Sequence, residues 1–382
     1  MEIDYGHSLV SLISSVMKHF GLDPAHETLP EADALLGRSY KNVVLLLFDG
    51  MGMSVLETLP PDSFLRKHLA GTISSVFPPT TTAATTSVLT GLEPIGHGWL
   101  GWSSWFYDKA LDGGLSAAEY TDYLKTADKS APGKVVNLYP NTSDGKPAAG
   151  FNVAGKFLPF EPVTDKLNRR GIPAYFVSPY SEPRADSVDA LFATVSGLCE
   201  DDTPKYIYGY SPLPDYRIHD YGISHPKIHK ILEQIDAGVE KLCSELTDSL
   251  VIVTADHGMV DTEFVFMDDH PEVKECLLRE PSIEGRAMSL FIKPVIYDFP
   301  ERFNAAYGGI YELFPHDEAV KLFGVGEQHP LAESFVGDYL AVAKTDVSIG
   351  YDFDPHPLRA AHGGGTADEF LIPFIVNNSK EI

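Results

Sequence analysis

The sequence predicts an α/β protein with a doubly wound, mostly parallel sheet and helices on both faces. Three observations support this prediction. Unbroken apolar runs at residues 43–48 and 250–254 are typical of strands that are buried on both sides. Strand-like runs alternate with helical patterns, as they do when helices cross over between parallel strands. Polar residues follow several of the runs, at the edge where open parallel sheets bind ligands.

The individual elements follow this pattern. Two further strands are expected at residues 172–177 and 206–210. The clearest helix is expected at residues 227–246, where apolar side chains recur on one stripe. This helix separates two predicted strands, as a crossover connection should.

We expect three regions in the chain: an N-terminal helical segment at residues 1–40, a core at 41–263 and 355–382, and an inserted lobe at 264–354. The βα alternation stops in the inserted segment, which we expect to shape the substrate pocket. Residues 129–156 are rich in Gly, Pro, Asn and Ser, so we expect loops there. Residues 8–17 are expected to form an amphipathic surface helix. We expect neither a secretion signal nor a membrane span.

Composition limits the partners. A net charge of −25 and a pI near 4.8 argue against a nucleic acid polymer or an anionic membrane. The three cysteines, Cys199, Cys243 and Cys276, have no paired spacing, so we expect free thiols and a cytoplasmic location. Nothing in the sequence indicates an oligomeric state.

Candidate metal ligands lie at or near the ends of the predicted strands. Asp256 and His257 follow the run 250–254, and Asp49 follows the run 43–48. A lone Asp-His pair after a strand is more often a structural turn. Here the same chemistry recurs at Asp215 and His219 after the run 206–210, and at His362 before the apolar run 370–376.

Three carboxylates and three imidazoles suit two divalent ions. Zinc is expected, with manganese or iron as alternatives, because calcium and magnesium prefer shells made only of oxygen. Two such ions about 3.5–4 Å apart hold the attacking and leaving oxygens of a displacement at phosphorus.

A candidate nucleophile lies in the threonine-rich stretch at residues 80–86. Prolines precede this stretch, and the helix that it opens ends at Gly91. A hydroxyl at a helix N-terminus lies where backbone N–H groups favour anionic oxygen. Most threonines in such a stretch have only a structural role, for example as an N-cap.

In this order, the ligands and the threonine cluster resemble the alkaline phosphatase superfamily, and most closely its nucleotide pyrophosphatase/phosphodiesterase branch, the type I phosphodiesterases. The resemblance covers about residues 41–376. It implies an alkaline phosphatase-like fold and a metal-dependent hydrolase acting on phosphoric ester bonds. The implied substrate is a nucleotide or another small phosphate ester.

The resemblance also implies residue roles. The family's nucleophile stands ten residues before the glycine of a Thr-Gly-Leu-x-Pro-x-x-His-Gly stretch, which lies here at residues 90–98, so Thr81 matches it and Thr80 and Thr82 are its neighbours. By the same resemblance, two zinc ions are expected. One would be held by Asp215, His219 and His362. The other would be held by Asp49, Asp256 and His257, with Thr81 bound to it as an alkoxide.

The chain departs from the family at one position. Where the diesterases place an Asn that contacts a phosphoryl oxygen, twenty-one residues after the nucleophile, this chain has Trp102. Ser103 or Ser104 is a candidate for the substitute donor, and Trp102, Ser103 and Thr82 are candidate substrate contacts. The only tryptophans, Trp99, Trp102 and Trp105, either stack an aromatic group of the substrate or pack in a core.

Other functions stay open at this point. A phosphomonoesterase or a phosphonate hydrolase would use the same groups, a manganese-dependent phosphosugar mutase shares the Asp-Gly-Met-Gly start, and a non-catalytic binding protein can share the fold.

We expect His97 to support the nucleophile loop, and Arg286 to form an ion pair in the lobe. Neither a P-loop pattern nor a Gly-x-Ser-x-Gly elbow occurs.

Overall fold

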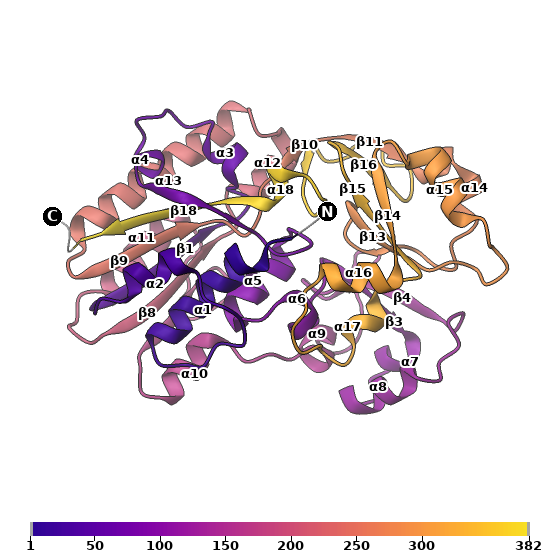
Figure 1. Ribbon diagram of the computed structural model, residues 1–382, viewed down its shortest axis with the longest axis horizontal. Coiled ribbons are helices and arrows are strands. Elements are labelled where there is room, and N and C mark those ends of the chain that lie inside the picture. Colours follow the sequence, from indigo (N-terminus) through magenta and orange to yellow (C-terminus); the bar gives the residue numbers. More distant parts are fainter. Residues whose placement is uncertain (1–2, 380–382) are drawn as a thin grey trace.

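A computed structural model describes residues 3–379 of the chain, which form two parts that lie side by side (Figure 1). One part contains a six-stranded, mostly parallel sheet between helices, and the other contains an eight-stranded sheet. The predicted α/β class with a doubly wound sheet is confirmed by the first part.

The six-stranded core sheet has four parallel strands at its centre and one edge. Strands β9, β1, β8 and β7 run parallel, while β18 is antiparallel to both of its neighbours, β9 and β2. All seven residues of β1 are buried, which explains its unbroken apolar sequence. In spatial order the strands are β2 (Leu69–Ser74), β18 (Leu371–Asn378), β9 (Ser249–Thr254), β1 (Asn42–Phe48), β8 (Lys205–Ser211) and β7 (Ala174–Val177).

Helices cover both faces of this sheet. On β8, Tyr206 packs against Phe20, which ends the first α-helix, whereas Gly209 on the opposite face lies against Leu191 of α11. The first face carries α1 (Leu9–His19), α2 (Pro30–Leu36), α5 (Thr81–Thr90) and α10 (Val163–Arg169), and the second carries α4 (Phe64–Lys67), α11 (Val188–Leu198) and α13 (Pro226–Glu245). The short elements of the core are η1 (Tyr5–His7), α3 (Met53–Leu56), α6 (Pro94–His97), α12 (Asp215–Tyr221), α18 (Ala367–Phe370) and the pair β10 (Val260–Asp261) and β17 (Ala360–Ala361).

The expected surface helix at residues 8–17 is wrong in one respect, because α1 is buried from Leu9 to Met17. Its serines made it look amphipathic. They fit a buried helix because they are small and bond to the backbone: Ser11 donates to Ser8 O and Ser15 donates to Leu29 O.

The eight-stranded sheet joins two distant segments of the chain. Strands from residues 282–343 pair with strands from residues 103–147 through one contact between Ile283 and Ser103. The second of these segments was expected in the core, with loops at 129–156, and several of its strands are too short to produce a periodic pattern. In spatial order the strands are β14 (Tyr311–Pro315), β15 (Tyr339–Ala343), β13 (Ala287–Leu290), β12 (Ser282–Ile283), β3 (Ser103–Tyr107), β4 (Gly133–Asn137), β5 (Thr142–Ser143) and β6 (Lys146–Pro147).

Short helices surround this second sheet, and one small parallel pair of strands lies beside it. The pair consists of β11 (Glu263–Phe266) and β16 (Val347–Gly350). The helices are α7 (Asp108–Leu111), α8 (Ala117–Leu124), α9 (Val153–Phe157), η2 (Met267–Asp269), α14 (Pro271–Lys274), α15 (Phe299–Tyr307), α16 (His316–Leu322) and α17 (Ala332–Phe335).

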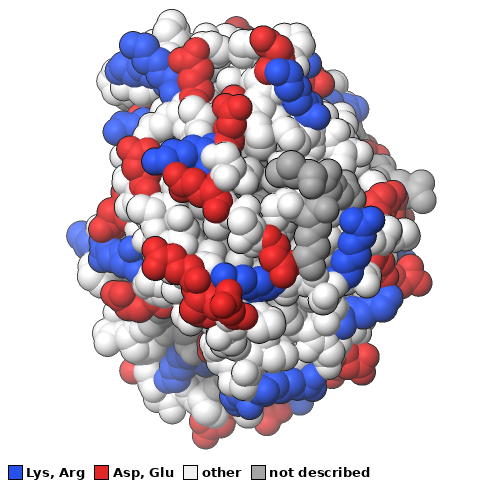
Figure 2. Space-filling view, turned by 90° about the vertical axis from the view of Figure 1, so that its left-hand side faces the viewer, with Lys and Arg blue, Asp and Glu red and all other residues white. Residues whose placement is uncertain are grey.

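The three cysteines are free and buried, as expected. Within residues 3–379, no helix has both the length and the apolar character needed to cross a membrane. On the face seen in Figure 2, acidic and basic side chains are interspersed, so the excess of acid is not gathered there in one patch.

A buried ion pair connects the two parts of the molecule. Arg286, directly before β13, donates to Glu369 of α18 through Nε at 2.7 Å and Nη2 at 2.9 Å, and both side chains are almost fully buried. Glu369 also accepts from Gly364 N and from Thr366 Oγ1, each at 2.7 Å. Arg286 forms an ion pair as expected, but its partner Glu369 lies in the core and not in the lobe, and the pair fixes the loop that follows His362.

Replacement of Arg286 by Ala should therefore destabilise the protein strongly. Loss of one partner leaves a buried, uncompensated charge, and we expect the free energy of unfolding to fall by about 3–5 kcal/mol. Urea unfolding followed by circular dichroism measures this. The control is Arg302→Ala, which removes an exposed pair with Asp298 and should cost about 1 kcal/mol or less. Equal small effects of both substitutions would contradict the role of the buried pair.

Candidate active site

The six predicted metal ligands converge at one edge of the core sheet. Asp49 directly follows β1, and Asp256 and His257 follow β9. Because β1, β8 and β9 are parallel, their carboxyl ends meet at the same edge. Asp215 begins α12 after β8, and His219 lies one helical turn further on, as its spacing suggested.

His362 reaches the same place through a different connection. It directly follows β17, which pairs antiparallel with β10, just beyond His257. A close contact helps to pack the loops together. Gly50 has a φ of 70°, and an added Cβ there would lie 2.8 Å from Asp215 Cβ. Only glycine fits this turn beside Asp49.

One group of possible metal ligands consists of Asp215, His219 and His362, the three residues that the resemblance placed together. Their ligand atoms all lie within 4.8 Å of one another. His219 Nε2 is 3.4 Å from Asp215 Oδ2, and His362 Nε2 is 3.8 Å from Asp215 Oδ1. This geometry could hold one divalent ion.

The second group contains Asp49, His257 and, again, Asp215. His257 Nε2 lies 3.2 Å from Asp49 Oδ1. Asp256, expected in this group, is close by, with Oδ2 3.6 Å from His257 Nε2. Its Oδ1 accepts hydrogen bonds of 3.0 Å from Gly50 N and His257 N, which leaves Oδ2 buried and without a hydrogen-bond partner.

The three imidazoles are oriented as metal ligands usually are. Each places Nδ1 against a backbone carbonyl: His219 against Ala360 at 2.8 Å, His257 against Gly258 at 3.0 Å, and His362 against Pro79 at 3.2 Å. A carbonyl can only accept, so each Nδ1 donates a hydrogen bond and Nε2 is the ring nitrogen left to face a metal ion. Asp215 Oδ1, like Asp256 Oδ2, is buried without a partner. The residues present therefore fit a pair of metal ions.

Electrostatics agree with this fit. Burial and the nearby charge of Asp49 raise the pKa of Asp256 well above its usual range. Burial lowers the pKa of His257, but the charges of Asp256 and Asp49 outweigh it and raise the value to about 10. Burial and the charge of His257 lower the pKa of His362 well below its usual range. Carboxylates this close repel one another, and a divalent cation would relieve the repulsion.

Thr81 is the threonine that faces this cluster. It is the first residue of α5, and its Oγ1 lies 3.2 Å from His257 Nε2 and 3.3 Å from Asp49 Oδ1. Thr80 instead donates to Glu284 Oε1 at 2.6 Å, and the buried Oγ1 of Thr82 has no partner. A hydroxyl in the position of Thr81 can attack an electrophile held beside the Asp/His cluster.

A cavity of about 310 Å³ opens beside Thr81 and contains Asp49, Asp215 and Thr82 in its lining. Among the residues that line it, none is Lys or Arg. Its walls are mainly aromatic and consist of Trp99, Trp102, Tyr139, Phe160, Phe176, Tyr180, Tyr208, Tyr210 and Tyr216. The cavity therefore suits an aromatic or apolar group next to the Asp/His cluster.

The other predicted substrate contacts divide between this cavity and the second sheet. Trp102, which is 38% exposed, lines the cavity, as does Trp99, whose indole donates to Leu158 O at 3.0 Å. Trp105 packs under Arg279 instead, and buried Ser103 belongs to β3 and does not line the cavity. His97 is buried with Nε2 3.0 Å from Ser87 Oγ in α5, so the expected support of the nucleophile segment is confirmed.

Two residues at the site were missed from the sequence. Tyr210 donates a hydrogen bond of 2.5 Å to Asp49 Oδ2. The alternation of Tyr206, Tyr208 and Tyr210 along β8 could have indicated that these tyrosines share one face of the strand. Glu284 accepts from Thr80 Oγ1, which is 204 positions away in the chain, and from Trp102 N at 2.7 Å. No local pattern could have identified Glu284.

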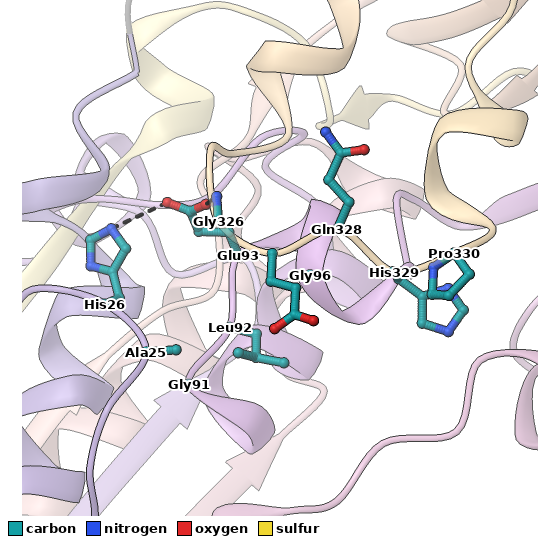
Figure 3. A pocket seen from close by; sticks show the side chains of 11 residues that line it. Ala25, His26, Gly91, Leu92, Glu93, Gly96, Gly326, Gln328, His329 and Pro330 are labelled. Atoms are coloured by element: carbon teal, nitrogen blue, oxygen red, sulfur yellow. Dashed lines mark hydrogen bonds and ion pairs between the residues drawn. The ribbon is translucent and has the colours of Figure 1, made fainter.

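A second cavity, of about 270 Å³, lies at the opposite end of α5, beside Gly91 (Figure 3). In Figure 3, His26 points toward Glu93, with Nε2 3.2 Å from Oε1. Glu93 Oε2 accepts from Val325 N and Gly326 N, so three distant segments meet at this carboxylate. None of the predicted catalytic or metal-binding residues lines this cavity, so the chemistry belongs to the cavity beside Thr81.

Comparisons with known proteins agree with the fold. The family model for type I phosphodiesterase / nucleotide pyrophosphatase matches residues 43–356. An inactive murine ectonucleotide pyrophosphatase/phosphodiesterase 5 in complex with AMP superimposes with a TM-score of 0.62 at 17% identity, covering 88% of each chain. The human enzyme of the same name gives a TM-score of 0.61 at 16% identity over 88% of this chain and 87% of that chain. No curated protein sequence matches the chain.

Fold and family together define the class of this protein: it is a hydrolase acting on phosphoric ester bonds, in the alkaline phosphatase superfamily. Within that class, the chain belongs to the type I phosphodiesterase / nucleotide pyrophosphatase family.

The site geometry predicts two divalent ions per chain. We expect His219→Ala to reduce the metal content of purified protein from about two ions to about one, because it removes a ligand from one group only. Asp49→Ala should remove the ion of the other group preferentially. Elemental analysis by mass spectrometry measures this, with His229→Ala on the exposed side of α13 as the control. A wild-type protein that is fully active without bound metal would contradict the prediction.

Proposed function

We propose that the protein hydrolyses phosphodiesters and nucleotide pyrophosphates through a covalent phosphothreonine at Thr81, assisted by two zinc ions. The observation that carries the proposal is the position of Thr81 Oγ1, within 3.3 Å of both Asp49 and His257 at the start of α5. Among the three threonines at residues 80–82, only this hydroxyl meets the ligand cluster.

In this proposal, Asp215, His219 and His362 hold one ion, and Asp49, Asp256 and His257 hold the other. Asp215 also lies within reach of the second group, which supports a short separation between the two ions. Imidazole and carboxylate ligands suit zinc, and manganese or iron would accept the same set. When bound, the two ions would stabilise the attacking and leaving oxygens.

The residues of the chain then act in two displacements. Thr81 Oγ1 gives up its proton toward Asp49, to which it donates a hydrogen bond, and forms a bond to phosphorus. The bond from phosphorus to the leaving oxygen breaks, and the leaving oxygen keeps the electron pair of that bond. Water next attacks the phosphothreonine, breaks the bond from phosphorus to Thr81 and restores the hydroxyl. Backbone N–H groups at the start of α5 favour the negative phosphoryl oxygens, and Tyr210 orients Asp49 through its 2.5 Å hydrogen bond.

The aromatic cavity supports a substrate with an aromatic group, such as a nucleobase. AMP, the ligand of the murine relative, is a compound of this kind. The three free, buried cysteines support a reducing compartment, so we also propose a cytoplasmic location.

Thr81→Ala should abolish turnover while metal content and folding stay unchanged. Removal of a covalent nucleophile lowers kcat by about 10⁴–10⁶-fold. The assay is release of p-nitrophenol from bis-p-nitrophenyl phosphate by zinc-loaded protein. Thr82→Ala is the matched control and should cost far less. If isotopic phosphate from the substrate labelled another residue, the assignment of Thr81 would be wrong.

Trp102→Ala should impair esters that carry a base more than esters that carry a methyl group. Loss of one stacking surface is worth about 1–3 kcal/mol, or roughly 5–150-fold in kcat/KM. The substrates are the p-nitrophenyl ester of thymidine 5′-monophosphate and methyl p-nitrophenyl phosphate. Tyr297→Ala, at an exposed aromatic residue outside the cavity, is the control. An equal loss for both substrates would show that Trp102 does not contact the base.

A further inference from the structure

Glu284 is an acidic residue at the site without a role in the reaction described above. It lies between β12 and β13, so the second sheet brings it to the core. Its Oε1 accepts from Thr80 Oγ1 at 2.6 Å and from Trp102 N at 2.7 Å. An added Cβ on Gly363 would lie 3.1 Å from Glu284 Cγ, so the side chain also packs against the residue after His362. Glu284 therefore touches the neighbours of two candidate catalytic groups.

The charge of Glu284 has no basic partner. Among residues 3–379, no Lys, Arg or His forms an ion pair with it, and no Lys or Arg lines the adjoining cavity. Burial raises the pKa of Glu284 to about 7, against the lowering effects of its two hydrogen bonds and of the charges of His257 and His219. Above that pH the carboxylate places a negative charge next to the residue before Thr81.

We propose that Glu284 makes the site selective for phosphoryl groups with a single negative charge, and thus for phosphodiesters over phosphomonoesters. This specificity role rests on the proposed function of Thr81. A monoester dianion carries one more charge than a diester. Two like charges about 6 Å apart repel by an energy equivalent to roughly 100-fold in binding at an effective dielectric constant of about 20, and by less where water screens them.

The makeup of the cavity points in the same direction. Sites that select dianionic phosphate usually present Arg or Lys, and Arg binds the oxygens in pairs. Here the cavity lining consists of aromatic rings, threonines and the carboxylates of Asp49 and Asp215, and the charge of Glu284 lies next to this lining, at Thr80 and Trp102 N. The buried guanidinium of Arg286, two residues beyond Glu284, is already paired with Glu369.

The test compares two substrates with the same leaving group, p-nitrophenyl phosphate and methyl p-nitrophenyl phosphate, on zinc-loaded protein at pH 8.5. Glu284→Gln keeps the size of the side chain and an oxygen that accepts from Thr80 and Trp102, but removes the charge. We expect the diester-to-monoester ratio of kcat/KM to fall at least tenfold, mainly because the monoester improves. The inhibition constant of inorganic phosphate should fall by a similar factor.

Glu280→Gln is the matched control, because it removes an exposed acid from the same segment without contact with the site. It should leave the ratio unchanged. Glu284→Ala, which is also uncharged, should give the same fall if Glu284→Gln does not fold.

An unchanged ratio in either folded, zinc-loaded Glu284 variant overturns the proposal, as does an equal change for both esters, which would indicate a positioning role. If the zinc-loaded wild type hydrolyses neither ester, the proposed function fails while the specificity role can still be tested. In that event, calorimetric binding of inorganic phosphate must tighten in Glu284→Gln, and no change would overturn the role of Glu284.

Discussion

The mutual repulsion of three buried carboxylates at the edge of the core sheet is the constraint on which the site depends. Asp49, Asp215 and Asp256 are all at least nine-tenths buried, and no Lys or Arg forms an ion pair with any of them in the described chain. Three imidazoles and the N–H groups of Gly50 and His257 compensate only part of this charge. Divalent cations would relieve this repulsion, and the orientation of each imidazole by a backbone carbonyl leaves Nε2 facing the place where they would bind.

The second sheet takes part in the site as well as covering it. Arg286 binds Glu369, and Glu369 holds the Gly364 and Thr366 backbone of the loop after His362. Glu284, from the same segment of the chain, binds the N-cap of α5 and the backbone of Trp102. Ligand geometry and substrate preference are thus linked to the packing of the two parts against each other.

Because the solved relatives share little sequence identity with this chain, the roles of its site residues must be argued from its own geometry. At 16–18% identity the neighbours establish the fold, whereas the arrangement of Thr81 beside Asp49 and His257 comes from this chain. Trp102 offers its ring to the cavity and donates its backbone N–H to Glu284.

The sequence by itself determined the local features. Apolar runs predicted the central strands, the spacing of Asp215 and His219 predicted one helix face, and the threonines before Gly91 predicted the start of α5. Each depends on a few neighbouring residues, so a single sequence can reveal it. Only the tertiary structure decided that Asp215 lies within reach of both ligand groups, that Tyr210 binds Asp49, and that Glu284 joins the site. These contacts depend on how strands distant in the chain pair and pack, and the pairing of β3 with β12 leaves no periodic trace in either segment.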